Sequence, residues 1–155
     1  MSPDDLRTIV VAVDFTLDSL AAVQEAFVLG KALESRLYLL HVVHEPLEDP
    51  DVPPKKKELK KALRPILEVA ADTMKAFVKE HDLARQAKQA KVGLETLVIH
   101  GLPASQIVHT AKKLKAGLIL LGYSGTTGIA NLLMGATTEK VLQLSELPVL
   151  VVKKR

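Results

Sequence analysis

The amino-acid sequence predicts an α/β fold in which a five-stranded parallel sheet carries helices on both faces. Two observations support this prediction. Short β-branched apolar runs alternate with longer stretches whose apolar residues recur at helical spacing. The runs are also apolar at nearly every position, as expected of parallel strands that are buried on both faces. Right-handed crossovers between such strands place helices on the two faces of the sheet.

The composition fits a single domain that spans residues 1–155. The chain is 48% hydrophobic but only 3% aromatic, so its core must consist mainly of aliphatic side chains and offers little for single-stranded nucleic acid to stack on. The net charge of +3 is spread along the chain, and Glu58 interrupts the basic run at 55–61, which favours a solvated helix face. We expect no nucleic-acid partner.

The sequence also carries no targeting or membrane feature. It contains no cysteine, which suits a reducing compartment. Residues 1–14 lack the order of a secretory signal, and no apolar run approaches the roughly 20 residues that span a bilayer. We therefore expect a cytoplasmic protein without a membrane partner.

The chain begins with a βαβ unit. Residues 8–15 and 36–43 form the apolar runs typical of buried strands, and a helix is predicted between them. Thr16, Asp18 and Ser19 are available to cap that helix. Its inward positions follow helical spacing: Leu20, Val23, Phe27 and Gly30.

A proline-rich connection at 44–61 then leads into a long helix, whose inward positions extend from Leu59 to Phe77. Pro65 lies inside this helix, where it lacks an amide donor and crowds the preceding turn. We therefore expect a kink or a restart at Pro65. A third strand is predicted at 92–101.

The last part of the chain continues the alternation. Pro103 is predicted to open a helix, and the apolar run from 117 forms a fourth strand that leads into a glycine loop. Thr137 or Thr138 begins the last helix, and residues 148–152 form the fifth strand.

Ligands of open parallel sheets lie outside the carboxyl ends of the strands, at the point where the strand order reverses. Asp14, Val43, His100 and Gly122 fall at such ends. The predicted fold therefore directs attention to the glycine loop that follows the fourth strand.

Three glycines make the loop at 122–138 a candidate phosphate site. Gly122 and Gly125 permit positive φ and a close approach of the backbone to a ligand. Gly135 precedes a helix whose first amides lack an internal partner and, with the helix dipole, attract anions. The spacing matches neither the Walker motif nor the dinucleotide fingerprint. From the residues alone, a tight connection without a ligand is an equal alternative.

Nearly the whole chain resembles the universal stress protein family. The likeness is carried by IVVAVDFTLDS at 9–19, LLHVV at 39–43, HGLPASQIV at 100–108 and AGLILLGYSGTTGIANLLMGATTEKVL at 116–142. The last segment contains the family's glycine motif: glycine, two residues, glycine, nine residues, then glycine followed by serine or threonine. The three loop glycines preserve this spacing.

The resemblance implies a Rossmann-like fold, a homodimer and, in members that carry the motif, ATP binding. The implied adenosine contacts lie at the ends of strands: Ala12, Asp14, Val42 and Leu121. The implied ribose and phosphate contacts come from the loop and the helix after it: Gly122, Gly125, Gly135, Ala136 and Thr137.

Two departures from the family pattern weaken the expected phosphate contacts. Ala136 replaces the hydroxyl residue of the motif, which removes a hydrogen bond worth about 0.5–1.5 kcal/mol and weakens binding roughly tenfold. No basic residue lies between Lys115 and Lys140. Backbone amides, the helix dipole and a bound Mg²⁺ would then have to neutralise ATP. AMP and ADP, which carry less charge, are open alternatives.

No catalytic or metal site is predicted. His41, His44 and His100 match no zinc spacing and are expected to be structural or solvent-facing. Asp18 is expected to cap a helix rather than pair with Asp14 as acid and base. Because no catalytic arrangement emerges, we expect at most slow ATP hydrolysis.

The last strand, at 148–152, is expected to lie at a sheet edge, where an unpaired apolar strand invites pairing with another chain. We therefore expect a homodimer through this strand. The alternative is that the basic residues 153–155 merely blunt the edge.

Two functions remain open at this point. In the first, the chain is a stress-response regulatory protein in which ATP occupancy orders the loop at 122–138 and changes a surface read by an unknown protein partner. In the second, it is a stress-linked interaction module that binds no nucleotide. The intact glycine spacing favours the first, whereas Ala136 and the uncharged loop favour the second.

Overall fold

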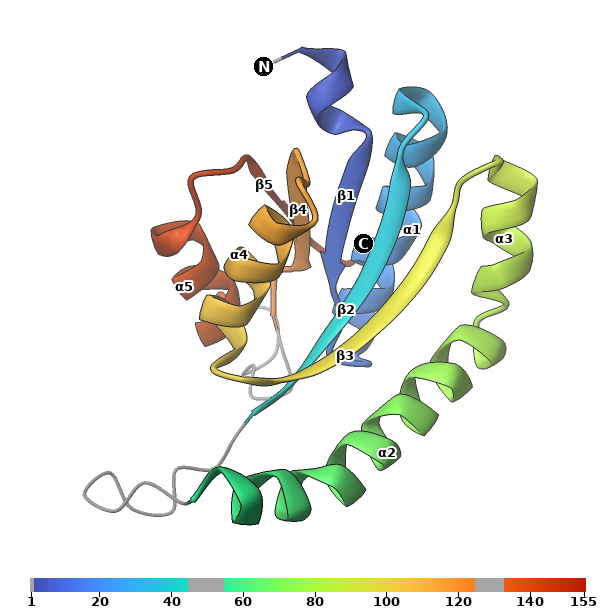
Figure 1. Cartoon of the computed structure of the whole chain (residues 1–155). Helices are drawn as coiled ribbons and strands as arrows, with labels where there is room; N and C mark the ends of the chain where they lie inside the picture. The colour runs from blue at the N-terminus through green and yellow to red at the C-terminus, as the bar shows by residue number, and fades with distance from the viewer. Residues whose placement is uncertain (1, 45–54, 125–132) are drawn as a thin grey trace.

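A computed structural model describes residues 2–44, 55–124 and 133–155, and in these residues five parallel strands form one sheet (Figure 1). The strand order is β3-β2-β1-β4-β5, so β3 and β5 are the edges. The strands are β1 (Thr8–Ala12), β2 (Arg36–His44), β3 (Leu94–Gly101), β4 (Leu118–Gly122) and β5 (Val149–Val152). The predicted parallel α/β fold is confirmed.

Helices cover both faces of this sheet (Figure 1). On one face lie α1 (Leu17–Leu33), α2 (Lys56–Glu80) and α3 (Leu83–Ala90), and on the other lie α4 (Pro103–Lys113) and α5 (Ala136–Leu144). Each face has its own apolar core. In β1, Ile9 and Val11 are buried in the core with α1, whereas Val10 is buried in the core with α4. Burial on both faces explains why the strands are apolar at consecutive positions.

Pro65 lies inside α2 without ending it. The prediction was a kink or a restart. The helix is continuous from Lys56 to Glu80, so it does not restart, and Figure 1 shows the axis bending within the first half. Pro65 leaves the carbonyl of Lys61 without its helical donor. Because both residues are exposed, water can bond to that carbonyl, and the helix continues.

The structure contains a short helix, α3, that the periodicity did not predict. α2 ends at Glu80 and α3 begins at Leu83, with Asp82 between them in the left-handed conformation at φ 54°. Leu83 and Ala87 are buried against the α1 face of the sheet. The break carries no glycine or proline.

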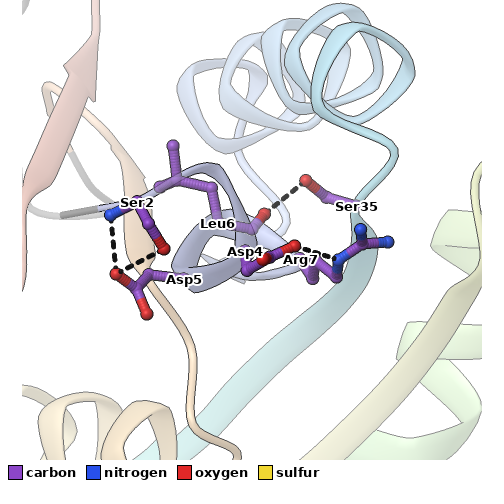
Figure 2. Close-up of polar contacts among 6 residues, drawn as sticks. All are labelled: Ser2, Asp4, Asp5, Leu6, Arg7 and Ser35. Atoms are coloured by element: carbon purple, nitrogen blue, oxygen red, sulfur yellow. Dashed lines mark hydrogen bonds and ion pairs between the residues drawn. The ribbon is translucent and has the colours of Figure 1, made fainter.

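The N-terminal turn (Pro3–Leu6, labelled η1) is attached at the amino ends of the strands (Figure 2). The amide of Ser2 donates to the Asp5 carboxylate at 2.8 Å, and the Ser2 hydroxyl donates to the same oxygen at 3.2 Å. These bonds hold the pKa of the Asp5 carboxyl below its ordinary value. The buried Ser35 hydroxyl donates to the carbonyl of Leu6.

Replacing Ser35 with alanine is expected to lower the free energy of unfolding by about 1–2 kcal/mol, because the Leu6 carbonyl loses its side-chain donor in a partly buried place. Urea denaturation measures the change. Ser105→Ala, at an exposed position on α4, is the matched control and should shift the midpoint little. Equal midpoints for the two variants would contradict the role given to Ser35.

Candidate functional site

The strand order reverses beside β1, whose two neighbours are β2 and β4. A cavity of about 480 Å³ opens there, outside the carboxyl ends of these three strands. Eight of the nine residues implied as nucleotide contacts line it: Ala12, Asp14, Val42, Leu121, Gly122, Gly135, Ala136 and Thr137. The ninth, Gly125, lies outside the described residues. The structure thus brings residues from four separate segments to one cavity.

One wall of the cavity is apolar. The buried residues Leu40 in the middle of β2, Leu121 near the end of β4 and Ile107 of α4 all line it. Ala12 and Val42 are half-buried and pack against the same core. Such a wall suits a flat heterocycle better than a charged group.

Gly122 is required by close packing of the backbone. A Cβ at this position would lie 2.7 Å from the carbonyl carbon and 2.8 Å from the carbonyl oxygen of Asp18, in the first turn of α1. Its φ is not positive, so the close approach of the Asp18 backbone, and not the conformational freedom of glycine, accounts for Gly122. The Thr138 hydroxyl donates to the Gly122 carbonyl at 2.8 Å, which joins β4 to α5.

The amide of Gly135, expected to face a phosphate, instead donates to the carbonyl of Tyr123 at 2.8 Å. Gly135 is the N-cap of α5, which therefore begins at Ala136, earlier than predicted. Among the described residues, the next amides, those of Ala136, Thr137 and Thr138, have no protein acceptor. These amides remain available to an anion in the cavity.

Asp14 is held at the rim by the turn that begins α1. Its carboxylate accepts hydrogen bonds from the amide of Thr16 at 3.1 Å and from the Thr16 hydroxyl. Thr16 in turn caps α1 by accepting from the amide of Ser19 at 3.2 Å. The strand was predicted to reach residue 15, but β1 ends at Ala12. Phe15 cannot continue the strand, because its φ is 65°.

Asp18 does not cap α1, as had been expected, because Thr16 occupies the N-cap. Its carboxylate accepts a hydrogen bond from the hydroxyl of Ser124, which is buried and lines the cavity. This bond ties the segment after β4 to the first turn of α1. The pair is 106 residues apart in sequence, and no local pattern indicates it.

His41 is hydrogen-bonded, as predicted, and it also lines the cavity. Its Nδ1 lies 2.7 Å from the carbonyl oxygen of Val13, and its ring lies 4.4 Å from that of Phe15, centroid to centroid. Phe15 also contacts Phe77 of α2, at 5.5 Å. A row of rings therefore connects the cavity rim with α2. Within the described parts of the chain, no group of three or more His, Cys, Asp or Glu residues could hold a metal ion.

The universal stress protein family model matches residues 5–153. The chain belongs to this family. It is 31% identical over 150 residues to universal stress protein MJ0531 of Methanocaldococcus jannaschii, covering 96% of this chain and 82% of that protein. The identity supports the resemblance that the glycine motif indicated.

Solved structures of the family share the fold. Protein MJ0577 of the same archaeon matches with a TM-score of 0.73 at 25% identity, and the match covers 96% of each chain. A universal stress protein in complex with cAMP matches with a TM-score of 0.63 at 25% identity, covering 96% of this chain and 97% of the other. The sheet described above is therefore the Rossmann-like sheet of this family.

No helix in the described ranges is long and apolar enough to cross a bilayer.

Proposed function

We propose that the chain is a cytoplasmic regulatory protein that binds an adenine nucleotide, with ATP, ADP and AMP as candidates. The observation that carries the proposal is the single cavity lined by eight residues that the family resemblance implies as nucleotide contacts. A related solved structure was obtained in complex with cAMP, which also contains adenine.

The two ends of the cavity match the two ends of a nucleotide. The base packs on the apolar wall between Ala12, Val42 and Leu121. The phosphate receives hydrogen bonds from the amides of Ala136 and Thr137 at the start of α5. Asp14 lies at the rim, where its carboxylate can accept from a ribose hydroxyl. Mg²⁺ would bind chiefly to phosphate oxygens and water.

Occupancy is transmitted through the segment after β4. Ser124 lines the cavity and is bonded to Asp18 of α1, while Thr138 joins α5 to Gly122. A ligand that bonds to the first amides of α5 stabilises this arrangement and so changes the surface that a protein partner meets. We infer at most slow hydrolysis, because the described cavity offers no paired acid and base.

Filling the base end of the cavity tests the proposal. Ala12→Phe is expected to weaken AMP binding at least tenfold, since the ring occupies the apolar wall and overpacking costs about 1–3 kcal/mol. Equilibrium dialysis with labelled AMP measures the change. Ala32→Phe, at an exposed position near the end of α1, is the matched control. If both variants bound AMP like the parent, the base would lie elsewhere.

A second function, a protein-interaction module without nucleotide, is favoured by Ala136, which has no hydroxyl to offer to a phosphate. One binding measurement distinguishes the two functions. The parent chain and Ala136→Ser would both fail to bind any adenine nucleotide if the second were correct.

We also propose a homodimer through β5. This strand pairs with β4 alone and leaves its outer edge open, and Leu150 on it is 37% exposed. Light scattering at micromolar concentration is expected to give twice the monomer mass of 16.8 kDa. Leu150→Glu is expected to give monomers, because two carboxylates would be buried together. A parent chain that scatters as a monomer would exclude this interface.

A further inference from the structure

The cavity has an unusual charge balance for a site that would hold a triphosphate. Among the described residues that line it, Asp14 is the carboxylate, none is a lysine or arginine, and the two histidines, His41 and His44, lie on β2 beside Val42 at the base end. A second carboxylate, that of Asp18, lies directly behind the lining hydroxyl of Ser124. The phosphate end therefore relies on backbone amides for its attraction.

Cations near the cavity are held elsewhere. The Lys153 ammonium lies 4.4 Å from the centroid of the Tyr123 ring, on a residue that does not line the cavity. Lys140 is exposed on α5 beyond its first turn. Lys112 pairs with Glu146 at 3.0 Å. The sequence from 116 to 139 contains no lysine or arginine at all.

The amides available to an anion are also few. The amide of Gly135 is already bonded to Tyr123, which leaves those of Ala136, Thr137 and Thr138 among the described residues. Adjacent amides in one helical turn converge on a single anionic group. They can satisfy one phosphate, and the described lining offers no lysine or arginine to a second or third.

We propose that this cavity selects an adenine nucleoside carrying at most one phosphate over the corresponding triphosphate, and that Asp14 and Asp18 enforce the selection. The inference rests on the proposed function and narrows its ligand class. Without Mg²⁺, ATP carries about two more negative charges than AMP, and both carboxylates repel them. Two such charges about 10 Å from each of the two carboxylates, in an open cavity where the dielectric is close to that of water, weaken binding on the order of tenfold.

The experiment is a titration of the full-length, nucleotide-stripped chain with adenosine, AMP, ADP and ATP, in EDTA at low ionic strength. AMP is expected to bind about tenfold more tightly than ATP, with ADP between them. Added Mg²⁺ neutralises part of the triphosphate charge and is therefore expected to reduce the difference between AMP affinity and ATP affinity. ATP binding equal to or tighter than AMP in EDTA would overturn the inference and leave the proposed function standing. Absence of binding by all four would overturn both.

Two charge variants test the cause of the selection. Thr137→Lys adds a cation at an exposed, cavity-lining position in the first turn of α5, and Gln143→Lys adds the same charge at an exposed position in its last turn. The first variant is expected to strengthen ATP binding about tenfold more than AMP binding. Gln143→Lys is expected to leave the ratio of AMP affinity to ATP affinity unchanged. Equal ratios in the two variants would overturn the electrostatic cause.

Asp14→Asn provides an independent arm, because asparagine removes the charge but keeps an oxygen that accepts from Thr16. The ratio of AMP affinity to ATP affinity is expected to fall about threefold. This is half of the parent's roughly tenfold preference for AMP on a logarithmic scale. An unchanged ratio would show that the carboxylate plays no part in the selection.

Discussion

Replacing Phe77 with alanine is expected to lower the free energy of unfolding by about 3–5 kcal/mol, the largest effect of any change considered. Phe77 is 5% exposed and lies at the centre of the row of rings. Its ring contacts Phe15 at 5.5 Å and His81 at 4.9 Å, and Phe15 contacts His41 at the cavity. Urea denaturation of the parent and the variant measures the loss.

Phe77→Leu is the matched control, because it keeps most of the buried volume and removes the ring edges. It is expected to cost about 1–1.5 kcal/mol. The alanine variant is also expected to weaken nucleotide binding, since Phe15 at φ 65° needs its neighbours to hold it there. Loss of less than 1 kcal/mol in Phe77→Ala would contradict the packing described for α2.

Gly122→Ala is expected to lower the free energy of unfolding by roughly 1–3 kcal/mol. The added Cβ would lie 2.7 Å from the backbone of Asp18, and backbone cannot rotate away as a side chain can. α1 must therefore shift relative to β4, which also displaces Ser124 from Asp18. Thermal unfolding and AMP titration together measure both consequences.

Gly93→Ala is the control for that variant. A Cβ at Gly93 would meet the flexible Arg36 side chain at 3.4 Å, an ordinary contact, and the position is exposed. The stability of this variant is expected to be unchanged or raised by up to about 1 kcal/mol, because alanine restricts the unfolded chain. If both glycine variants were equally stable, close packing at the end of β4 would not explain Gly122.

Local patterns predicted most of the fold. The central strands β1 and β4 were predictable because they are buried on both faces and therefore apolar along their length. The edge strands β3 and β5 are only partly buried, but each still contains a short apolar run. The start of α4 followed from Pro103, and the N-cap of α1 was among the three predicted candidates. α3 was not predictable, since the chain turns at Asp82 in a left-handed conformation that sequence seldom marks without glycine.

The candidate site was predictable only in part. Strand ends and glycines indicated where the cavity lies, because parallel strands end together at one edge of a sheet. The sequence alone did not show why each of these residues is needed at its position. Gly122 serves the packing of α1, and the amide of Gly135 serves Tyr123. Both depend on contacts between segments far apart in the sequence, which no local spacing records.

The most direct test of the nucleotide hypothesis is a calorimetric titration of the nucleotide-stripped chain with AMP and with Mg²⁺–ATP, repeated on Ala136→Ser. The serine would place the hydroxyl of the family motif at the first residue of α5, where it could donate to a phosphate. Binding in the micromolar range by the parent, strengthened about tenfold by serine for a phosphate-bearing ligand, is the predicted result. No binding heat in either protein would contradict the nucleotide hypothesis and would indicate that the glycine loop has a purely structural role.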